Sequence, residues 1–108
     1  MEYEPDDWVV LKIKSENEIF YKVFAGWRGG YLDGDSWRMN SGIVAFEDQS
    51  PLYGFYGFSG SVYWCHKSNY GIRGMYNNDV LSRILQQGES IVSIMPSETD
   101  WSNVQWQQ

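Results

Sequence analysis

The sequence predicts an α+β fold: a curved antiparallel sheet or partial barrel of about six strands with one helix packed on it. Three observations lead to this prediction. Several short runs alternate apolar and polar side chains and end at turn residues, as half-buried strands do. One later segment, 79–87, has a single apolar stripe at helical spacing. The 108 residues, 43% of them hydrophobic, suffice for one core, so we expect a single domain over 1–108.

The first part of the chain is expected to be a loose lead-in followed by a hairpin. Residues 1–7 are acidic and include a proline, which predicts an irregular start. Segments 8–14 and 19–27 both alternate in polarity, and the polar stretch 15–18 lies between them. We therefore expect these two segments to pair as antiparallel strands.

The second half is expected to add a meander of three strands. The runs 43–48, 52–58 and 61–67 have the composition of strands, and turn residues at 48–51 and 59–60 separate them. Short connections of this kind join antiparallel neighbours, so the three strands are expected to be adjacent in one sheet.

A helix, a last strand and a tail are expected to complete the chain. The helix is predicted over 79–87, and Asn77 or Asn78 can cap its N-terminus. Segment 89–95 alternates again and is predicted to be a strand. Residues 97–108 are mostly polar and are expected to form a polar tail.

The glycine-rich segment 26–42, between the hairpin and the meander, is the candidate functional site. It holds five of the eleven glycines and two of the six tryptophans, and 36–39 within it can form a short strand. Glycine permits backbone conformations with φ > 0, aromatic rings offer flat apolar faces, and arginine offers a forked donor. Two structural alternatives are open: the tryptophan rings could cover a local core, and the arginines could form internal ion pairs with the aspartates of the segment. The candidate partner- or ligand-binding residues are Trp27, Arg28, Tyr31, Asp33, Asp35, Trp37, Arg38 and Asn40.

The charge and the lone cysteine limit the classes of partner and the location. Fourteen acidic and eight basic residues give a net charge of −6, which disfavours direct nucleic-acid binding and favours a partner with a basic surface. Cys65 is the single cysteine, so no internal disulfide is expected. The N-terminus lacks the pattern of a signal peptide, and no apolar run approaches the roughly 20 residues of a membrane helix. We expect a cytoplasmic protein without a membrane contact.

The residues of catalytic type do not form a recognisable set. His66 and Cys65 are neighbours on a predicted strand, so their side chains are expected on opposite faces. Asp33 and Asp35 resemble part of a calcium loop but lack the distal glutamate. We expect no metal, no cofactor and no enzymatic activity; chemistry by Asp33 or Asp35 is a weaker alternative.

Two motifs resemble those of small accessory proteins encoded by bacteriophages. The first is GWxGGYLDGDSWRxNSGI at 26–43, and the second is GSVYxCHK at 60–67. Weaker resemblance continues at 70–71 and 99–101. The resemblance implies a small acidic protein in the host cytoplasm, of a kind that commonly acts on host machinery or host defences. It implies no catalytic or ligand residues.

Two functions follow as hypotheses. The first is a non-enzymatic protein that binds and inhibits a host or defence complex, as anti-CRISPR proteins do, with its acidic clusters imitating a nucleic acid. The alternative is a small-ligand binder that sequesters a nucleotide signal through the 26–42 loop, with a tryptophan or Tyr31 stacking on the base and Arg28 and Arg38 holding phosphate. A further hypothesis is that the protein is a subunit of a virion or complex and that the loop has a purely structural role.

Overall fold

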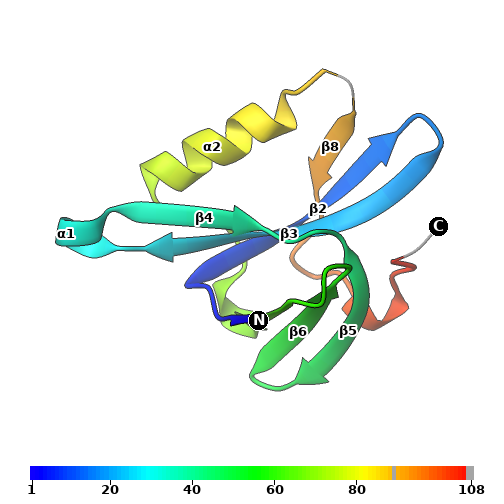
Figure 1. Ribbon diagram of the computed structural model, residues 1–108, viewed down its shortest axis with the longest axis horizontal. Coiled ribbons are helices and arrows are strands. Elements are labelled where there is room, and N and C mark those ends of the chain that lie inside the picture. The colour runs from blue at the N-terminus through cyan, green and yellow to red at the C-terminus, as the bar shows by residue number, and fades with distance from the viewer. Residues whose placement is uncertain (89, 107–108) are drawn as a thin grey trace.

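The computed structural model describes residues 1–88 and 90–106 and has an α+β architecture of two four-stranded sheets and one long helix (Figure 1). Sheet A consists, in spatial order, of β1 (Glu2–Tyr3), β7 (Val62–His66), β6 (Leu52–Gly57) and β5 (Ile43–Gln49). Sheet B consists of β4 (Asp35–Met39), β3 (Glu18–Arg28), β2 (Asp7–Ser15) and β8 (Ile91–Ile94). The helices are α1 (Gly30–Asp33), α2 (Met75–Leu85) and the short 3-10 turns η1 (Lys67–Asn69) and η2 (Trp101–Asn103). Neither sheet closes into a barrel over these residues.

The strand pairings predicted from alternation are confirmed. Strands β2 and β3 form an antiparallel hairpin, with Asp7 opposite Gly26 and Ser15 opposite Glu18. Strands β5, β6 and β7 form the meander, and β4 lies within the glycine-rich segment where a short strand was expected. The ladder between β5 and β6 shifts register around Val44, which is a bulge in the edge strand of sheet A.

The prediction of a loose N-terminus is wrong. Strand β1 pairs in parallel with β7, and the Met1 carbonyl accepts a hydrogen bond from the Val62 N–H (3.0 Å). The Tyr3 ring packs on Tyr63 with centroids 4.8 Å apart. Asp7 is fully buried and begins β2. A short acidic segment is therefore ordered here because a distant strand supplies the pairing partner.

The tail is also more structured than its polarity predicts. Trp101 lies in η2 and is buried, and its ring contacts Trp8, Phe55 and Trp106. The Asp100 side chain accepts from the Ser102 N–H and caps this turn. The apolar area of two indole rings outweighs the polar residues around them, so the segment closes the core. Residues 107–108 of the predicted tail lie outside the described part of the chain.

Helix α2 begins four residues earlier than predicted. Asn77 and Asn78 lie inside the helix, and the capping position is Gly74, with φ of 93°. The Asn77 side chain instead donates to the Ser36 carbonyl (2.9 Å), and Asn78 donates to the carbonyls of Ile72 and Gly74. The predicted last strand, 89–95, is observed as β8, while Glu89 lies outside the described residues.

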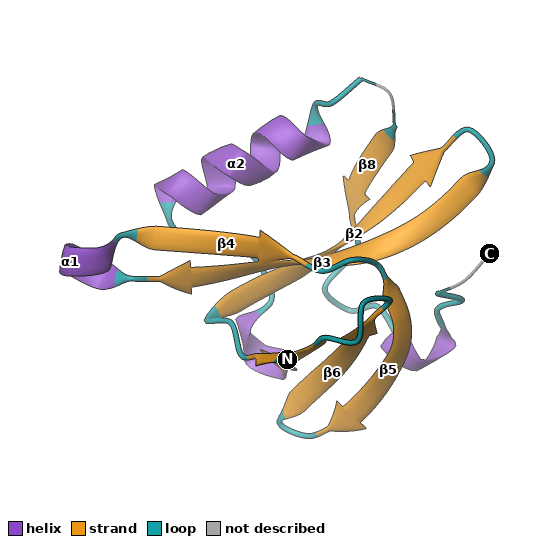
Figure 2. Cartoon of the chain, viewed as in Figure 1, coloured by secondary structure: helices purple, strands orange, loops and turns teal. Residues whose placement is uncertain are grey.

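The molecule has two apolar clusters, one on each face of sheet B. Helix α2 lies over one face of sheet B, and sheet A packs against the other (Figure 2). Strand β2 was expected to be half-buried, but it is apolar on both faces because it lies between these two layers. The cluster between the sheets includes Trp8, Val10, Tyr21, Val23, Phe55, Tyr63, Cys65 and Trp101. The cluster under α2 includes Val9, Leu11, Ile13, Phe24 and Leu81.

Replacing Trp101 with alanine is expected to remove about 3–5 kcal/mol of unfolding free energy, because a fully buried indole leaves a cavity. The measurement is urea unfolding. The matched control is Trp37→Ala, since Trp37 is 38% exposed and its loss leaves no closed cavity. Equal losses in the two variants would show that the tail does not close the core.

Candidate functional site

The glycine-rich segment forms a hairpin that projects from the body of the molecule (Figure 1). Strands β3 and β4 are its arms, and the single turn α1 is its tip. Gly30 begins α1 and Gly34 follows its last residue, with φ of 70° and 68°, a conformation that residues with a Cβ disfavour. Leu32, between them, is 88% exposed. These two glycines therefore shape the exposed tip of the hairpin.

The alternation of side chains divides the predicted site residues between the two faces of the hairpin. Trp27 and Arg38 lie on the face toward sheet A, where both contact Tyr3. The Trp27 indole N–H donates to the Glu4 carbonyl (3.1 Å), and the Arg38 guanidinium lies 4.7 Å from the centre of the Tyr3 ring. These contacts place Arg38 beside sheet A.

Arg28, Asp35 and Trp37 lie on the opposite face, toward α2. Trp37 stacks on Phe24 with centroids 5.4 Å apart and planes at 8°. Asp35 lies against Gly74, where an added Cβ would be 2.6 Å from the carboxylate. Since Arg28 and Arg38 occupy different faces, they do not line a common pocket. The side chains of Tyr31 and Asp33 are outside the described part of the structure.

Asn40 lies at the end of β4 and is 4% exposed. Its carbonyl oxygen accepts from the Val23 N–H (2.9 Å), and its amide nitrogen has no hydrogen-bond partner among the described residues. It borders a polar cavity of about 210 Å³, which we call the Arg38 pocket. The lining residues are Tyr3, Arg38, Met39, Asn40, Ser41, Ser59, Ser61 and Tyr63.

A second ordered surface, not foreseen from the sequence, lies on the outer face of sheet A. Across the strand order β1-β7-β6-β5 it presents Glu2, Trp64, Tyr56 and Glu47, and we call these four residues the aromatic–acidic face. The Trp64 indole N–H donates to Glu2 (2.6 Å), and the Tyr56 hydroxyl donates to Glu47 (2.5 Å). The two rings meet edge to face with centroids 6.2 Å apart. The row is thus held by contacts within the sheet.

Hydrogen bonding fixes the charge state of this face. The Tyr56 hydroxyl and then the Gln49 amide donate to Glu47, and these bonds lower the pKa of its carboxyl group. The same hydrogen bond raises the pKa of Tyr56. Glu47 is therefore an anion and Tyr56 a neutral donor at neutral pH.

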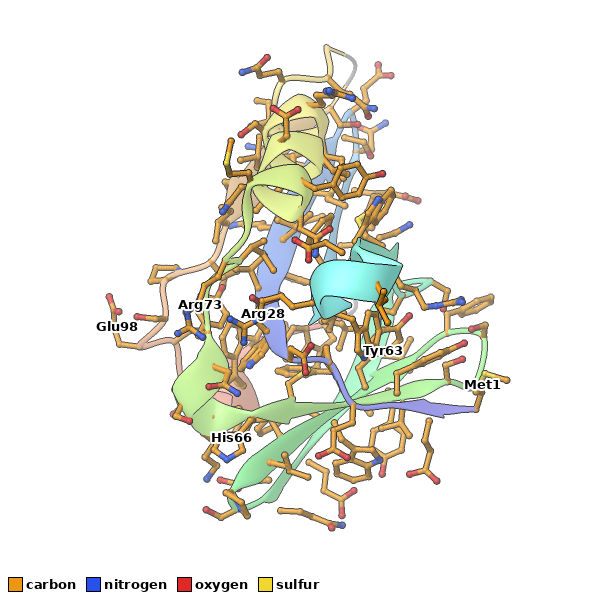
Figure 3. All side chains as sticks on the ribbon, turned by 90° about the vertical axis from the view of Figure 1, so that its left-hand side faces the viewer. Met1, Arg28, Tyr63, His66, Arg73 and Glu98 are labelled. Carbon is orange, nitrogen blue, oxygen red and sulfur yellow. The ribbon has the colours of Figure 1, made fainter. Side chains whose placement is uncertain are left out.

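Asp7 is the one acidic residue that is buried in the part of the chain that the structure describes. One oxygen accepts from the Arg73 N–H (3.0 Å), and the other has no partner among the described residues. Burial raises the pKa of Asp7; the Arg73 hydrogen bond and the charges of Arg28 and Arg73 act in the opposite direction. In Figure 3, Arg28 and Arg73 lie near each other and well apart from Tyr63.

Cys65 and His66, the two neighbouring residues of catalytic type, lie on opposite faces of β7. Cys65 is buried, and burial raises the pKa of its thiol well above the ordinary value, so it is a neutral thiol. His66 points to the other face and accepts from the Ser68 N–H at the start of η1. Within the described residues, no group of three or more His, Cys, Asp or Glu side chains could hold a metal ion. No helix there has the length and apolarity needed to cross a membrane.

Comparison of the chain with protein-family models, curated proteins and solved structures finds no match.

Gly54 makes room for the Trp64 ring, since an added Cβ would lie 2.5 Å from the ring. Gly54→Ala is expected to displace the indole, break its hydrogen bond to Glu2 and cost about 1–3 kcal/mol. Urea unfolding and near-UV circular dichroism measure these effects. Gly88→Ala, where an added Cβ meets no atom within 4 Å, is the control and is expected to be near neutral. Unchanged dichroism in Gly54→Ala would contradict the ring placement.

Asp7→Asn is expected to flatten the pH dependence of stability. The raised pKa means that the unfolded chain ionises first as pH rises, so the wild type loses stability from about pH 4 up to the pKa of the buried carboxyl. The variant keeps an acceptor for the Arg73 N–H but has no proton to lose. The unfolding free energy of the variant minus that of wild type, measured by chemical unfolding, should therefore be more positive at pH 7 than at pH 3. Parallel profiles for the two proteins would refute the assignment.

Proposed function

We propose that this chain is a non-enzymatic binding protein that docks its aromatic–acidic face on a basic surface of another protein. The observation that carries the proposal is the row of Glu2, Trp64, Tyr56 and Glu47, in which two partly exposed rings lie between two anchored carboxylates across one sheet. Side chains that are already hydrogen-bonded lose less conformational entropy on association.

The charges of the row suit a cationic partner. Glu47 is ionised, and each of its oxygens accepts one hydrogen bond from the described residues, so both oxygens can accept further bonds from a guanidinium or ammonium group. Three strand spacings of about 4.8 Å separate β1 from β5 by roughly 14 Å across the sheet, and Glu47 lies two residues farther along β5 than the position level with Glu2. The two carboxylates would thus engage two separate basic groups, and the net charge of −6 would speed the encounter.

The rings supply the apolar part of such an interface. Tryptophan and tyrosine are enriched among residues that dominate binding energy. Trp64 lies flat over Gly54, so its ring is positioned by the backbone beneath it. The row therefore combines an apolar centre with charged ends, which is the usual division of an interface into core and rim.

The biological role that fits this face is inhibition of a host or defence complex in the host cytoplasm. The resemblance to bacteriophage accessory proteins supports this context, and an acidic face of this kind would occupy a surface that otherwise holds a nucleic acid. The protein would act by occupancy, without a cofactor and without touching nucleic acid itself. The β3–β4 hairpin is a second candidate surface, because Leu32 and Trp37 are exposed on it.

The alternative function, binding of a nucleotide by the 26–42 segment, requires Arg28 and Arg38 to contact the phosphate of the same ligand. Arg28 and Arg38 lie on opposite faces of the hairpin, so this geometry favours the protein-binding function. The Arg38 side of the hairpin has a smaller site of its own, considered below.

The test is capture of partners from host lysate on the immobilised protein, at low and high salt. The variant Glu2→Gln/Glu47→Gln removes two charges from the face, and Glu16→Gln/Glu98→Gln removes two exposed charges elsewhere. A partner held by wild type and by the control, but bound about tenfold or more weakly by the face variant, is the expected result. Binding should also weaken as salt rises.

Three results would count against the proposal. Equal capture by both double variants would remove the aromatic–acidic face from the interface, and loss confined to Trp37→Ala would move the interface to the hairpin. Absence of any captured protein even at low salt would argue against a binding function of this type.

A further inference from the structure

We propose that the Arg38 pocket binds a tetrahedral oxyanion, namely a phosphate group. This site is separate from the aromatic–acidic face. One wall, which includes the cation Arg38, comes from the end of β4 and the two residues after it, and the others come from β1, β7 and the turn before β7. The inference does not depend on the proposed docking function.

The pocket is rich in donors and has no acidic side chain. Its eight lining residues include a guanidinium, a carboxamide, three serine hydroxyls and two tyrosines, in a chain with fourteen acidic residues. Arg38 forms no ion pair with a described residue. A positive group with no anion beside it, surrounded by neutral donors, is the complement of an anion.

The orientation of Asn40 points to the same ligand class. Its oxygen faces the Val23 N–H, which can only donate, so the carboxamide cannot be turned around without losing that bond. The nitrogen is therefore a donor with no partner among the described residues, and it is almost wholly enclosed at the pocket wall. A buried donor without an acceptor costs about 1–3 kcal/mol, so a small shift of Asn40 that lets an oxyanion in the pocket accept from it would remove that cost.

Two hydroxyl groups of the pocket also have a proton that can be donated to a ligand. The Ser41 hydroxyl donates to Ser59 (3.1 Å), which leaves the Ser59 hydroxyl proton free for a ligand. No described residue hydrogen-bonds the Tyr63 hydroxyl, and burial raises the pKa of Tyr63 to about 12 although the charge of Arg38 acts to lower it. Tyr63 is thus a protonated donor between the hairpin and sheet A (Figure 3).

The guanidinium of Arg38 is held in position before any ligand enters. It lies over the Tyr3 ring at 4.7 Å from the ring centre, and Tyr3 in turn packs on Tyr63. An arginine fork fixed in this way can offer two parallel N–H donors to one phosphate. The Ser59 and Ser61 hydroxyls come from the turn before β7, whereas Asn40 and Ser41 follow Arg38 in its own segment. Donors from two segments suit a tetrahedral group better than a planar carboxylate.

The size of the pocket limits the ligand. A volume of about 210 Å³ is below the roughly 300–1,000 Å³ of sites that enclose drug-sized ligands. It accommodates free phosphate or the phosphate group of a larger molecule whose remainder lies outside. Both sources share the same chemistry at the pocket.

The experiment is calorimetric titration of the whole protein with sodium phosphate, with sodium chloride and sodium acetate at equal ionic strength as references. Phosphate is expected to bind and acetate to bind more weakly. Arg38→Gln is expected to weaken phosphate binding about tenfold or more, because hydrogen bonds to charged groups are lost. Arg83→Gln makes the same charge change on α2, where Arg83 pairs with Asp79, and is expected to leave binding unchanged.

Further arms keep the test decisive if Arg38→Gln disturbs the fold. Ser61→Ala and Tyr63→Phe each remove one hydroxyl and keep the rest of the side chain, and each is expected to reduce affinity severalfold. Thermal unfolding in chloride checks that every variant is folded. Titration with glycerol phosphate separates the sources: tighter binding than inorganic phosphate assigns the site to a phosphate group of a larger ligand, and weaker binding assigns it to the free ion.

The proposal is overturned by any of three results. These are no phosphate binding by wild type at millimolar concentration, equal weakening by Arg38→Gln and Arg83→Gln, and binding of chloride or acetate as tightly as phosphate. The Glu2→Gln/Glu47→Gln protein should keep its phosphate affinity, so failure of the docking function and failure of this site are distinguishable.

Discussion

The two sheets are joined by Trp8, and the positions of both candidate surfaces depend on it. Its indole N–H donates to the His66 carbonyl (2.8 Å), which ties β2 in sheet B to the end of β7 in sheet A. Its ring contacts Phe55 and Trp101, and its own carbonyl accepts from the Gly71 N–H. One buried side chain thus fixes the hairpin of sheet B relative to sheet A. The Arg38 pocket, with walls from both sheets, exists because that relation is fixed.

The features that could be predicted from the sequence are those with a local cause. Alternation in 8–14 and 19–27 was enough to predict the β2–β3 hairpin, and turn residues were enough to predict the meander. Asp7 and Trp101 were assigned to a loose start and a polar tail, because their burial is created by residues far away in sequence. Nothing near Asp7 in the chain indicates that Arg73 will supply its hydrogen bond.

The candidate site likewise has some features that the sequence predicts locally and others that depend on long-range packing. The sequence identified Arg38 and Asn40, and strand alternation already implied that Arg38 and Trp37 face opposite ways. It did not indicate that Ser59 and Ser61 would meet them, because that depends on how the two sheets pack. The aromatic–acidic face needed the order β1-β7-β6-β5, in which the first strand of the chain is added beside the seventh. Spatial order of this kind is set by long-range pairing and not by local pattern.

The irregular edge of sheet A has a consequence for self-association. Strand β5 has free backbone groups along one side, and a flat edge of that kind is a template for strands from other copies. The bulge around Val44 breaks the spacing of those groups, and the neighbouring charges of Glu47 and Asp48 would oppose the same charges on a second molecule. The bulge and the acidic side chains therefore oppose pairing of β5 with the same strand of a second copy.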